Sequence, residues 1–287
     1  MDLSGMPPMA FVVSGIIAIT GINMVNRLAV KSIKTRWGVI AANYCVALAL
    51  SFAMFVLNGF HSASLLTVGL GVVSGLLYIG GMYLGMTTIG RRGASIAVSA
   101  SQLSVLIPVS LSVLIYGDSL GVTQLVGVGV ALVSLPLLAA RESGLNGALD
   151  RETLVLIVVQ LVVQGFAQFT SKVLVASGLG AERDAFFLVV FSAATLMTIP
   201  VALRHRGEIA PRDFVYGSAV GVCNIGVNLS TLLALTLLPG AVVFPLVNSG
   251  GLLFVTILAW LIFKERITRV NALGIALTLA AVLLINL

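Results

Sequence analysis

Charged side chains are scarce in this sequence: Asp, Glu, Lys and Arg make up 9% of its 287 residues, whereas apolar residues make up 59%. A soluble domain carries about 25% charged residues. So few charges cannot cover a surface that faces water, and the mean hydropathy of +1.13 indicates that lipid covers much of the protein. The net charge of +6 does not indicate a nucleic-acid partner, because the basic residues lie in short loops between apolar runs.

Several kinds of functional site are also missing. Cys45 and Cys223 are the two cysteines, and both lie inside apolar runs, so no disulfide framework is indicated. No phosphate-binding loop of the Walker type occurs, so this chain does not draw its energy from bound ATP. No cluster of His, Cys and carboxylates suggests a metal, and no nucleophile–base pair suggests an enzyme. We therefore expect no catalytic residues, no metal and no cofactor.

Long apolar segments dominate what is present. A helix needs about 20 mostly apolar residues to cross roughly 30 Å of hydrocarbon, and a lone helix satisfies its own backbone hydrogen bonds in lipid. The sequence predicts ten such helices, at residues 9–30, 38–58, 64–88, 94–116, 122–139, 153–177, 185–203, 214–236, 241–263 and 270–287.

The chain divides into two related halves, 1–140 and 153–287, joined by a charged, glycine-containing linker at 141–152. A shift of 147 residues places Gly93-Ala94 on Gly240-Ala241, and Tyr116-Gly117-Asp118 on Phe263-Lys264-Glu265. Each half has five predicted helices, and because five is odd the second half crosses the membrane upside down. The expected fold is an all-α membrane protein with ten transmembrane helices in two inverted five-helix repeats, an architecture that recurs in transporters.

Two motifs in the halves resemble those of EamA-type transporters of the drug/metabolite transporter superfamily. The first runs from Gly-Ala-Ser-Ile-Ala at 93–97 through Pro108 to Tyr-Gly-Asp-Ser-Leu at 116–120. The second runs from Pro-Gly-Ala-Val-Val-Phe-Pro at 239–245 to Phe-Lys-Glu-Arg-Ile at 263–267. The resemblance covers nearly the whole chain and implies ten helices around a central cavity, with export or exchange of amino acids, sugars, nucleotide-like compounds or drugs. Asp118 stands where the family usually has Glu.

Basic residues are divided unevenly between the two expected membrane faces. Fourteen of the sixteen lie in loops at 27–36, 91–92, 141–151, 204–212 and 264–269, and only Lys172 and Arg183 belong to the other face. The positive-inside rule then places both termini outside the cytoplasm, whereas the family resemblance implies cytoplasmic termini. We expect a multi-pass protein of the cell (inner) membrane with non-cytoplasmic termini.

Polar side chains inside the predicted spans are the candidates for substrate binding. Polar groups are costly in a bilayer, so they face protein or a water-filled cavity. Gln160, Gln164, Gln168 and Lys172 follow one another at four-residue spacing, which places them along one helix face. The alternative is that these groups hydrogen-bond neighbouring helices and only stabilise packing. The predicted substrate-binding residues are Asn23, Tyr78, Tyr83, Ser99, Gln102, Gln164, Gln168, Lys172, Asn224, Asn228 and Asn248.

Lys172 is the one base well inside a predicted span, and no Asp or Glu lies inside any. Its ammonium is therefore expected to be the only deep fixed charge and to bind a substrate carboxylate or phosphate, unless it merely extends to the membrane surface. Asp118 and Glu265, at loop ends, are expected to cap helices or lock a conformation.

These features predict a secondary-active or facilitative carrier of a small neutral, zwitterionic or anionic metabolite, working by alternating access. A cationic drug exporter or a non-transporting membrane protein such as a lipid scramblase is the alternative. The partners are a small solute and the lipid bilayer, and the oligomeric state is left open.

Overall fold

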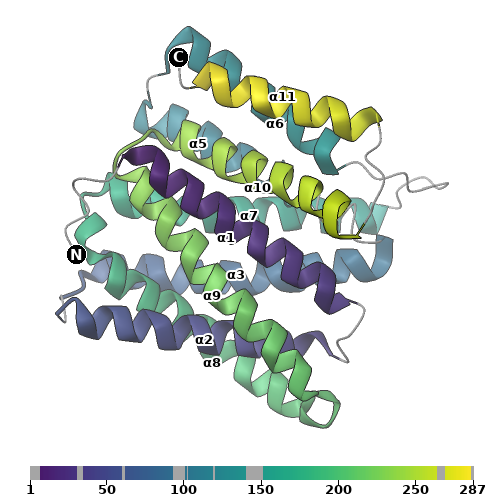
Figure 1. Ribbon diagram of the computed structural model, residues 1–287. Coiled ribbons are helices and arrows are strands. Elements are labelled where there is room, and N and C mark those ends of the chain that lie inside the picture. Colours follow the sequence, from purple (N-terminus) through teal and green to yellow (C-terminus); the bar gives the residue numbers. More distant parts are fainter. Residues whose placement is uncertain are drawn as a thin grey trace. The chain divides into compact units, whose positions relative to one another are not determined.

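The computed structural model describes residues 7–30, 35–59, 62–92, 101, 103–118, 120–139, 151–263 and 269–285, and these residues form helices joined by turns, with no strand among them (Figure 1). The α-helices are α1 (Pro8–Val30), α2 (Arg36–Leu57), α3 (Leu65–Arg92), α5 (Leu106–Tyr116), α6 (Val122–Ala139), α7 (Arg151–Ala176), α8 (Arg183–Arg204), α9 (Pro211–Leu235), α10 (Gly240–Phe263) and α11 (Arg269–Ile285).

Seven of these helices, α1, α2, α3 and α7 to α10, are long and apolar enough to cross a membrane. Three shorter apolar stretches lie at Leu106–Tyr116, Val122–Ser134 and Ala272–Leu284. Exposed side chains such as Leu65, Val122 and Leu283 are apolar, which suits a surface covered by lipid. The chain is thus an all-α, multi-pass membrane protein, as predicted. The predicted segment 94–116 lies partly outside the described residues, and the predicted 141–152 linker lies almost entirely outside them.

The chain forms two compact units that interleave along the sequence. Unit 1 contains residues Met1–Ile79 and Val173–Leu237, and unit 2 contains Gly80–Lys172 and Leu238–Leu287. Each unit therefore takes helices from both of the halves that the sequence repeat defines. The predicted repeats and the compact units are different divisions of the same chain.

Small residues bring the helices of unit 1 close together. A β-carbon on Gly217 of α9 would lie 2.5 Å from the backbone oxygen of Val39 on α2, and one on Gly221 would lie 2.6 Å from the backbone oxygen of Asn43. On α3, Gly75 approaches the backbone oxygen of Val190 on α8 in the same way, at 2.6 Å. Glycine at these positions of α3 and α9 therefore serves helix packing, because larger side chains would push the helices apart.

Unit 2 packs α10 against α5, α6 and α11, and α6 lies alongside α11 (Figure 1). The pair α6–α11 carries a buried hydrogen bond of 3.0 Å from the hydroxyl of Thr278 to that of Ser134. Gly165 of α7 lies against Ile107 of α5, where a β-carbon would be 2.7 Å from that side chain. The close approach at Gly165 brings the middle of α7 against α5.

Candidate functional site

Three amides and one phenol in unit 1 form a continuous hydrogen-bonded chain, here called the α9 amide network. Asn224 and Asn228 are one turn apart on α9, and the amide of Asn228 donates to the side-chain oxygen of Asn224 at 2.8 Å. The amide of Asn224 donates to the side-chain oxygen of Asn43 on α2 at 3.1 Å. The hydroxyl of Tyr78 on α3 donates to the side-chain oxygen of Asn228. The network thereby links α9 to both α2 and α3.

The α9 amide network lies within apolar spans and carries no formal charge. Asn43 is 2% exposed, while Tyr78, Asn224 and Asn228 are partly exposed. The ring of Tyr78 also lies 6.5 Å from that of Phe191 on α8, measured between centroids. Amide and hydroxyl groups both donate and accept hydrogen bonds. The arrangement can therefore bind a neutral polar group and offers an aromatic face beside it.

The three glutamines of α7 bond to neighbouring segments of unit 2. Gln160 accepts from Thr88 at 2.7 Å and donates to Ser101 at 3.1 Å. Gln164 donates to the backbone oxygen of Gly81 at 3.3 Å. Gln168 donates to the hydroxyl of Ser104 at 2.9 Å and accepts from Asn248 on α10 at 3.4 Å. These bonds are of the kind expected if the glutamines of α7 stabilise helix packing. A role of Gln164, Gln168 and Asn248 in substrate binding stays a prediction.

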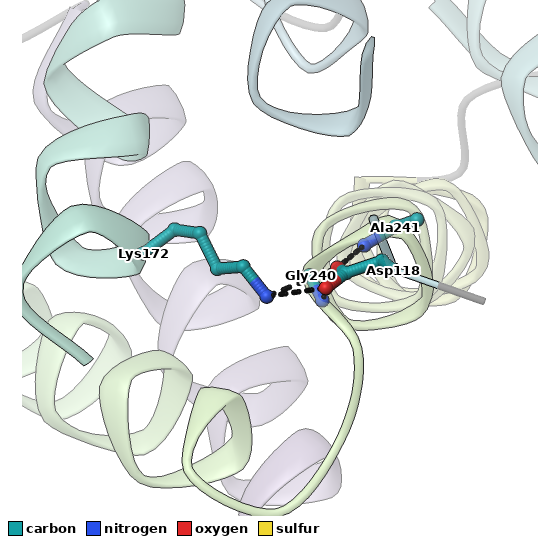
Figure 2. A network of polar contacts seen from close by, with 4 residues as sticks. All are labelled: Asp118, Lys172, Gly240 and Ala241. Atoms are coloured by element: carbon teal, nitrogen blue, oxygen red, sulfur yellow. Dashed lines mark hydrogen bonds and ion pairs between the residues drawn. The ribbon is translucent and has the colours of Figure 1, made fainter. Parts of the chain in front are cut away.

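Lys172, which follows Gln168 by four residues on the same face of α7, has a specific charged partner. Its ammonium lies 2.7 Å from one oxygen of Asp118 and 3.0 Å from the other (Figure 2). Both side chains are 9% exposed. The expectation that Lys172 is the only deep fixed charge is therefore wrong, because Asp118 is equally buried and neutralises it. Burial to this extent also argues against a lysine that extends to the membrane surface.

Asp118 also holds the first residues of α10. Its second oxygen accepts hydrogen bonds from the backbone nitrogens of Gly240, at 2.7 Å, and Ala241, at 3.3 Å (Figure 2). The first N–H groups of a helix have no partner within the helix, so a carboxylate at that end is favourable. The helix-capping role predicted for Asp118 is confirmed. Glu265 lies outside the described residues.

Four predicted site residues remain: Asn23, Tyr83, Ser99 and Gln102. The amide of Asn23 donates to the backbone oxygen of Ile19 on its own helix at 2.9 Å. Tyr83 belongs to the unit 2 part of α3, and its side chain is 54% exposed. Ser99 and Gln102 lie outside the described residues.

Acidic residues at the helix ends of unit 1 also have structural partners. Asp184, 5% exposed at the start of α8, accepts from the amide of Asn58 at 2.7 Å. Asp213, fully buried at the start of α9, accepts from the backbone nitrogen of Ala210 at 2.9 Å. Within the part of the chain that the structure describes, no three His, Cys, Asp or Glu side chains gather as a metal would require.

Sequence reasoning missed two members of these clusters. Asn43 is the single amide well inside the apolar segment predicted at 38–58. Because an unpaired amide is costly in lipid, its position there could have predicted a polar partner on another helix. The pairing of Lys172 with Asp118 spans 54 residues. It had no local signal, because it depends on how α5 and α7 pack.

Comparisons with known proteins identify the fold but not the activity. No family model matches the chain. A stretch of 186 residues, 64% of this chain, is 27% identical to an uncharacterized protein of Haemophilus influenzae, and the match spans 63% of that protein's length. A solved structure described only as the crystal structure of a protein matches with a TM-score of 0.73, at 14% identity. That match covers 96% of this chain and 98% of the other, so the chain shares its fold with a solved structure.

Proposed function

We propose that the chain is a secondary-active or facilitative carrier of the EamA type, which moves a small polar metabolite across a cell membrane by alternating access. The α9 amide network is the observation that carries this proposal. Three amides and a phenol within apolar spans are costly in lipid. Their presence therefore indicates a use in helix packing or in solute binding. Tyr78, Asn224 and Asn228 are the partly exposed members of this network, and we assign solute binding to them.

The composition of the two units supports ten transmembrane helices in inverted repeats. In the predicted order, α2 and α8 are the second helices of the two halves, and they pack against each other in unit 1. The fifth helices, α6 and α11, pack against each other in unit 2. Pairing of equivalent helices is expected when two repeats are related by a two-fold axis. Transporters built in this way commonly move one bundle relative to another.

The charges favour a solute that is neutral or zwitterionic. The candidate network in unit 1 is uncharged, and the ammonium of Lys172 is matched by Asp118. A cationic drug exporter usually needs a buried carboxylate that exchanges a proton for the cation. Asp118 is such a buried acid, but in this conformation Lys172 and the first residues of α10 hold both of its oxygens. The cationic substrate is therefore the weaker alternative.

A reconstituted flux assay tests the proposal. A panel of metabolites is first screened for ligands that raise the thermal stability of the purified protein, since a ligand that binds the folded state stabilises it. Uptake of each hit is then measured in proteoliposomes and in protein-free liposomes. We expect uptake that saturates with solute concentration and requires protein. No uptake of any stabilising ligand would contradict a carrier.

Two further measurements separate the carrier from its alternatives. Asn228→Ala should lower the uptake rate or the affinity by about tenfold, the effect of one lost hydrogen bond of about 1.4 kcal/mol. Thr256→Val is the matched control, because Thr256 bonds only to Leu252 of its own helix among the contacts described. Transfer of fluorescent lipids between leaflets, measured in the same vesicles, would indicate a scramblase if it occurred without solute uptake.

A further inference from the structure

The beginning of α10 collects hydrogen-bond donors around one carboxylate. The backbone nitrogens of Gly240 and Ala241 point at Asp118, and the ammonium of Lys172 approaches the same group from α7 (Figure 2). The ammonium also lies 5.7 Å from the ring centroid of Tyr116. A helix amino terminus and a cation together favour an anion.

One further polar group lies at this point. The hydroxyl of Ser112 on α5 is fully buried and makes no hydrogen bond within the described part of the chain. It faces the first residue of α10, because a β-carbon on Gly240 would lie 2.5 Å from it. That β-carbon would also lie 3.3 Å from the side chain of Lys172. Glycine at position 240 therefore lets Ser112 and Lys172 approach the start of α10 more closely than a side chain there would allow.

We propose that Gly240, Ala241, Lys172 and Ser112 form a binding site for a small carboxylate, which Asp118 fills as an internal ligand in this conformation. The donors match the two oxygens of a carboxylate, and the burial of the Lys172 and Asp118 side chains, each 9% exposed, limits the ligand to a small one. A solute carboxylate and Asp118 then compete for the same donors. This site belongs to unit 2 and shares no residue with the uncharged network of unit 1, and the proposal does not depend on transport activity.

Chemical rescue of Asp118→Ala tests this site. The substitution removes a carboxylate and leaves a methyl group, so formate supplies the missing atoms. We expect Asp118→Ala to unfold at a lower temperature than the wild type and to be restabilised by formate in a saturable way. Formate at about tenfold above its dissociation constant should raise the unfolding midpoint by roughly 3–6 °C. The wild type should respond far less, because formate must displace Asp118 from the donors.

Three controls make the result specific. Gluconate at the same ionic strength is too large, because of its polyol chain, for the space that the substitution leaves. It should not restabilise Asp118→Ala. Asp118→Asn fills the space with a neutral group and should not respond to formate. Asp118→Ala combined with Lys172→Gln should lose most of the response, because the ammonium is gone.

The proposal is overturned if formate stabilises the wild type and Asp118→Ala equally, or if neither responds. Asp118→Ala that folds only when it is prepared in formate would support the site. Failure to fold with and without formate would contradict it, since an external carboxylate should refill a true binding site.

Discussion

The hydroxyl of Tyr78 on α3 donates a hydrogen bond to the side-chain oxygen of Asn228 on α9, 150 residues later in the chain. This bond joins the two halves of the sequence inside unit 1. Through Asn224 it extends to Asn43 on α2. A change at any one member is therefore expected to leave another polar group without a partner.

Tyr78→Phe removes only the hydroxyl and leaves the ring beside Phe191. We expect the free energy of unfolding to fall by about 1–3 kcal/mol, because Asn228 then loses a donor in an apolar environment. Thermal or denaturant unfolding in detergent measures the effect. Tyr83→Phe is the control, since the Tyr83 side chain is 54% exposed and the change should cost under about 0.5 kcal/mol. Equal stability of Tyr78→Phe and wild type would mean that the hydroxyl contributes little.

Gly217 is predicted to be the least replaceable glycine of α9. Gly217→Ala would place a methyl group 2.5 Å from both the Val39 oxygen and the Ala42 β-carbon, so α2 and α9 must separate. We expect a loss of stability of about 3 kcal/mol or more, at the upper end of the range for overpacking. Gly129→Ala on α6 is the control, because nothing lies within 4 Å of its β-carbon. It should be neutral or stabilise the helix by up to about 1 kcal/mol. If both variants behave alike, close packing at Gly217 does not matter.

The sequence was most informative about the helices. Apolar length alone predicted 38–58 and 185–203, and α2 and α8 occupy Arg36–Leu57 and Arg183–Arg204. The ends differ by one or two residues, and at the start of α2 a polar cap accounts for the difference. Thr35, for example, accepts from the backbone nitrogen of Trp37 and so begins α2 earlier. Hydropathy cannot detect such a cap.

Local spacing was less informative about the candidate site. The four-residue spacing of Asn224 and Asn228 places them on one face of α9, because residues four apart are neighbours on a helix. It could not identify their partners Asn43 and Tyr78, which lie on other helices. The charge of Lys172 was misjudged for the same reason: Asp118 lies near it only because α5 and α7 pack together. Long-range pairing depends on tertiary structure that the spacing does not encode.

The orientation of the chain in the membrane is open to a direct test. Fourteen of the sixteen basic residues belong to one set of predicted loops, so we expect both termini outside the cytoplasm. A reporter that is active only in the cytoplasm, fused after Leu287, should be silent, and the same reporter inserted in the 141–152 linker should be active. The reverse pattern would show cytoplasmic termini, as the family resemblance implies.

The final prediction concerns the Lys172–Asp118 pair. Lys172→Gln keeps the length of the side chain but leaves Asp118 buried with no cation beside it, and removing one partner of a buried ion pair typically costs about 3–5 kcal/mol. We therefore expect Lys172→Gln to lower the free energy of unfolding clearly. The double variant Lys172→Gln/Asp118→Asn should recover most of that loss, since two neutral amides can hydrogen-bond each other and the amide oxygen introduced at position 118 can still accept from the backbone nitrogen of Gly240. A double-mutant cycle of unfolding free energies measures the coupling, which should reach about 3 kcal/mol or more, the upper end for residues in contact.

The same variants separate a structural from a binding role once a ligand is known. If Lys172 also contacts an anionic solute, Lys172→Gln should weaken its binding by about ten- to a hundredfold, and the double variant should not restore that affinity. Recovery of both stability and affinity in the double variant would limit Lys172 to holding Asp118 and the start of α10 in place.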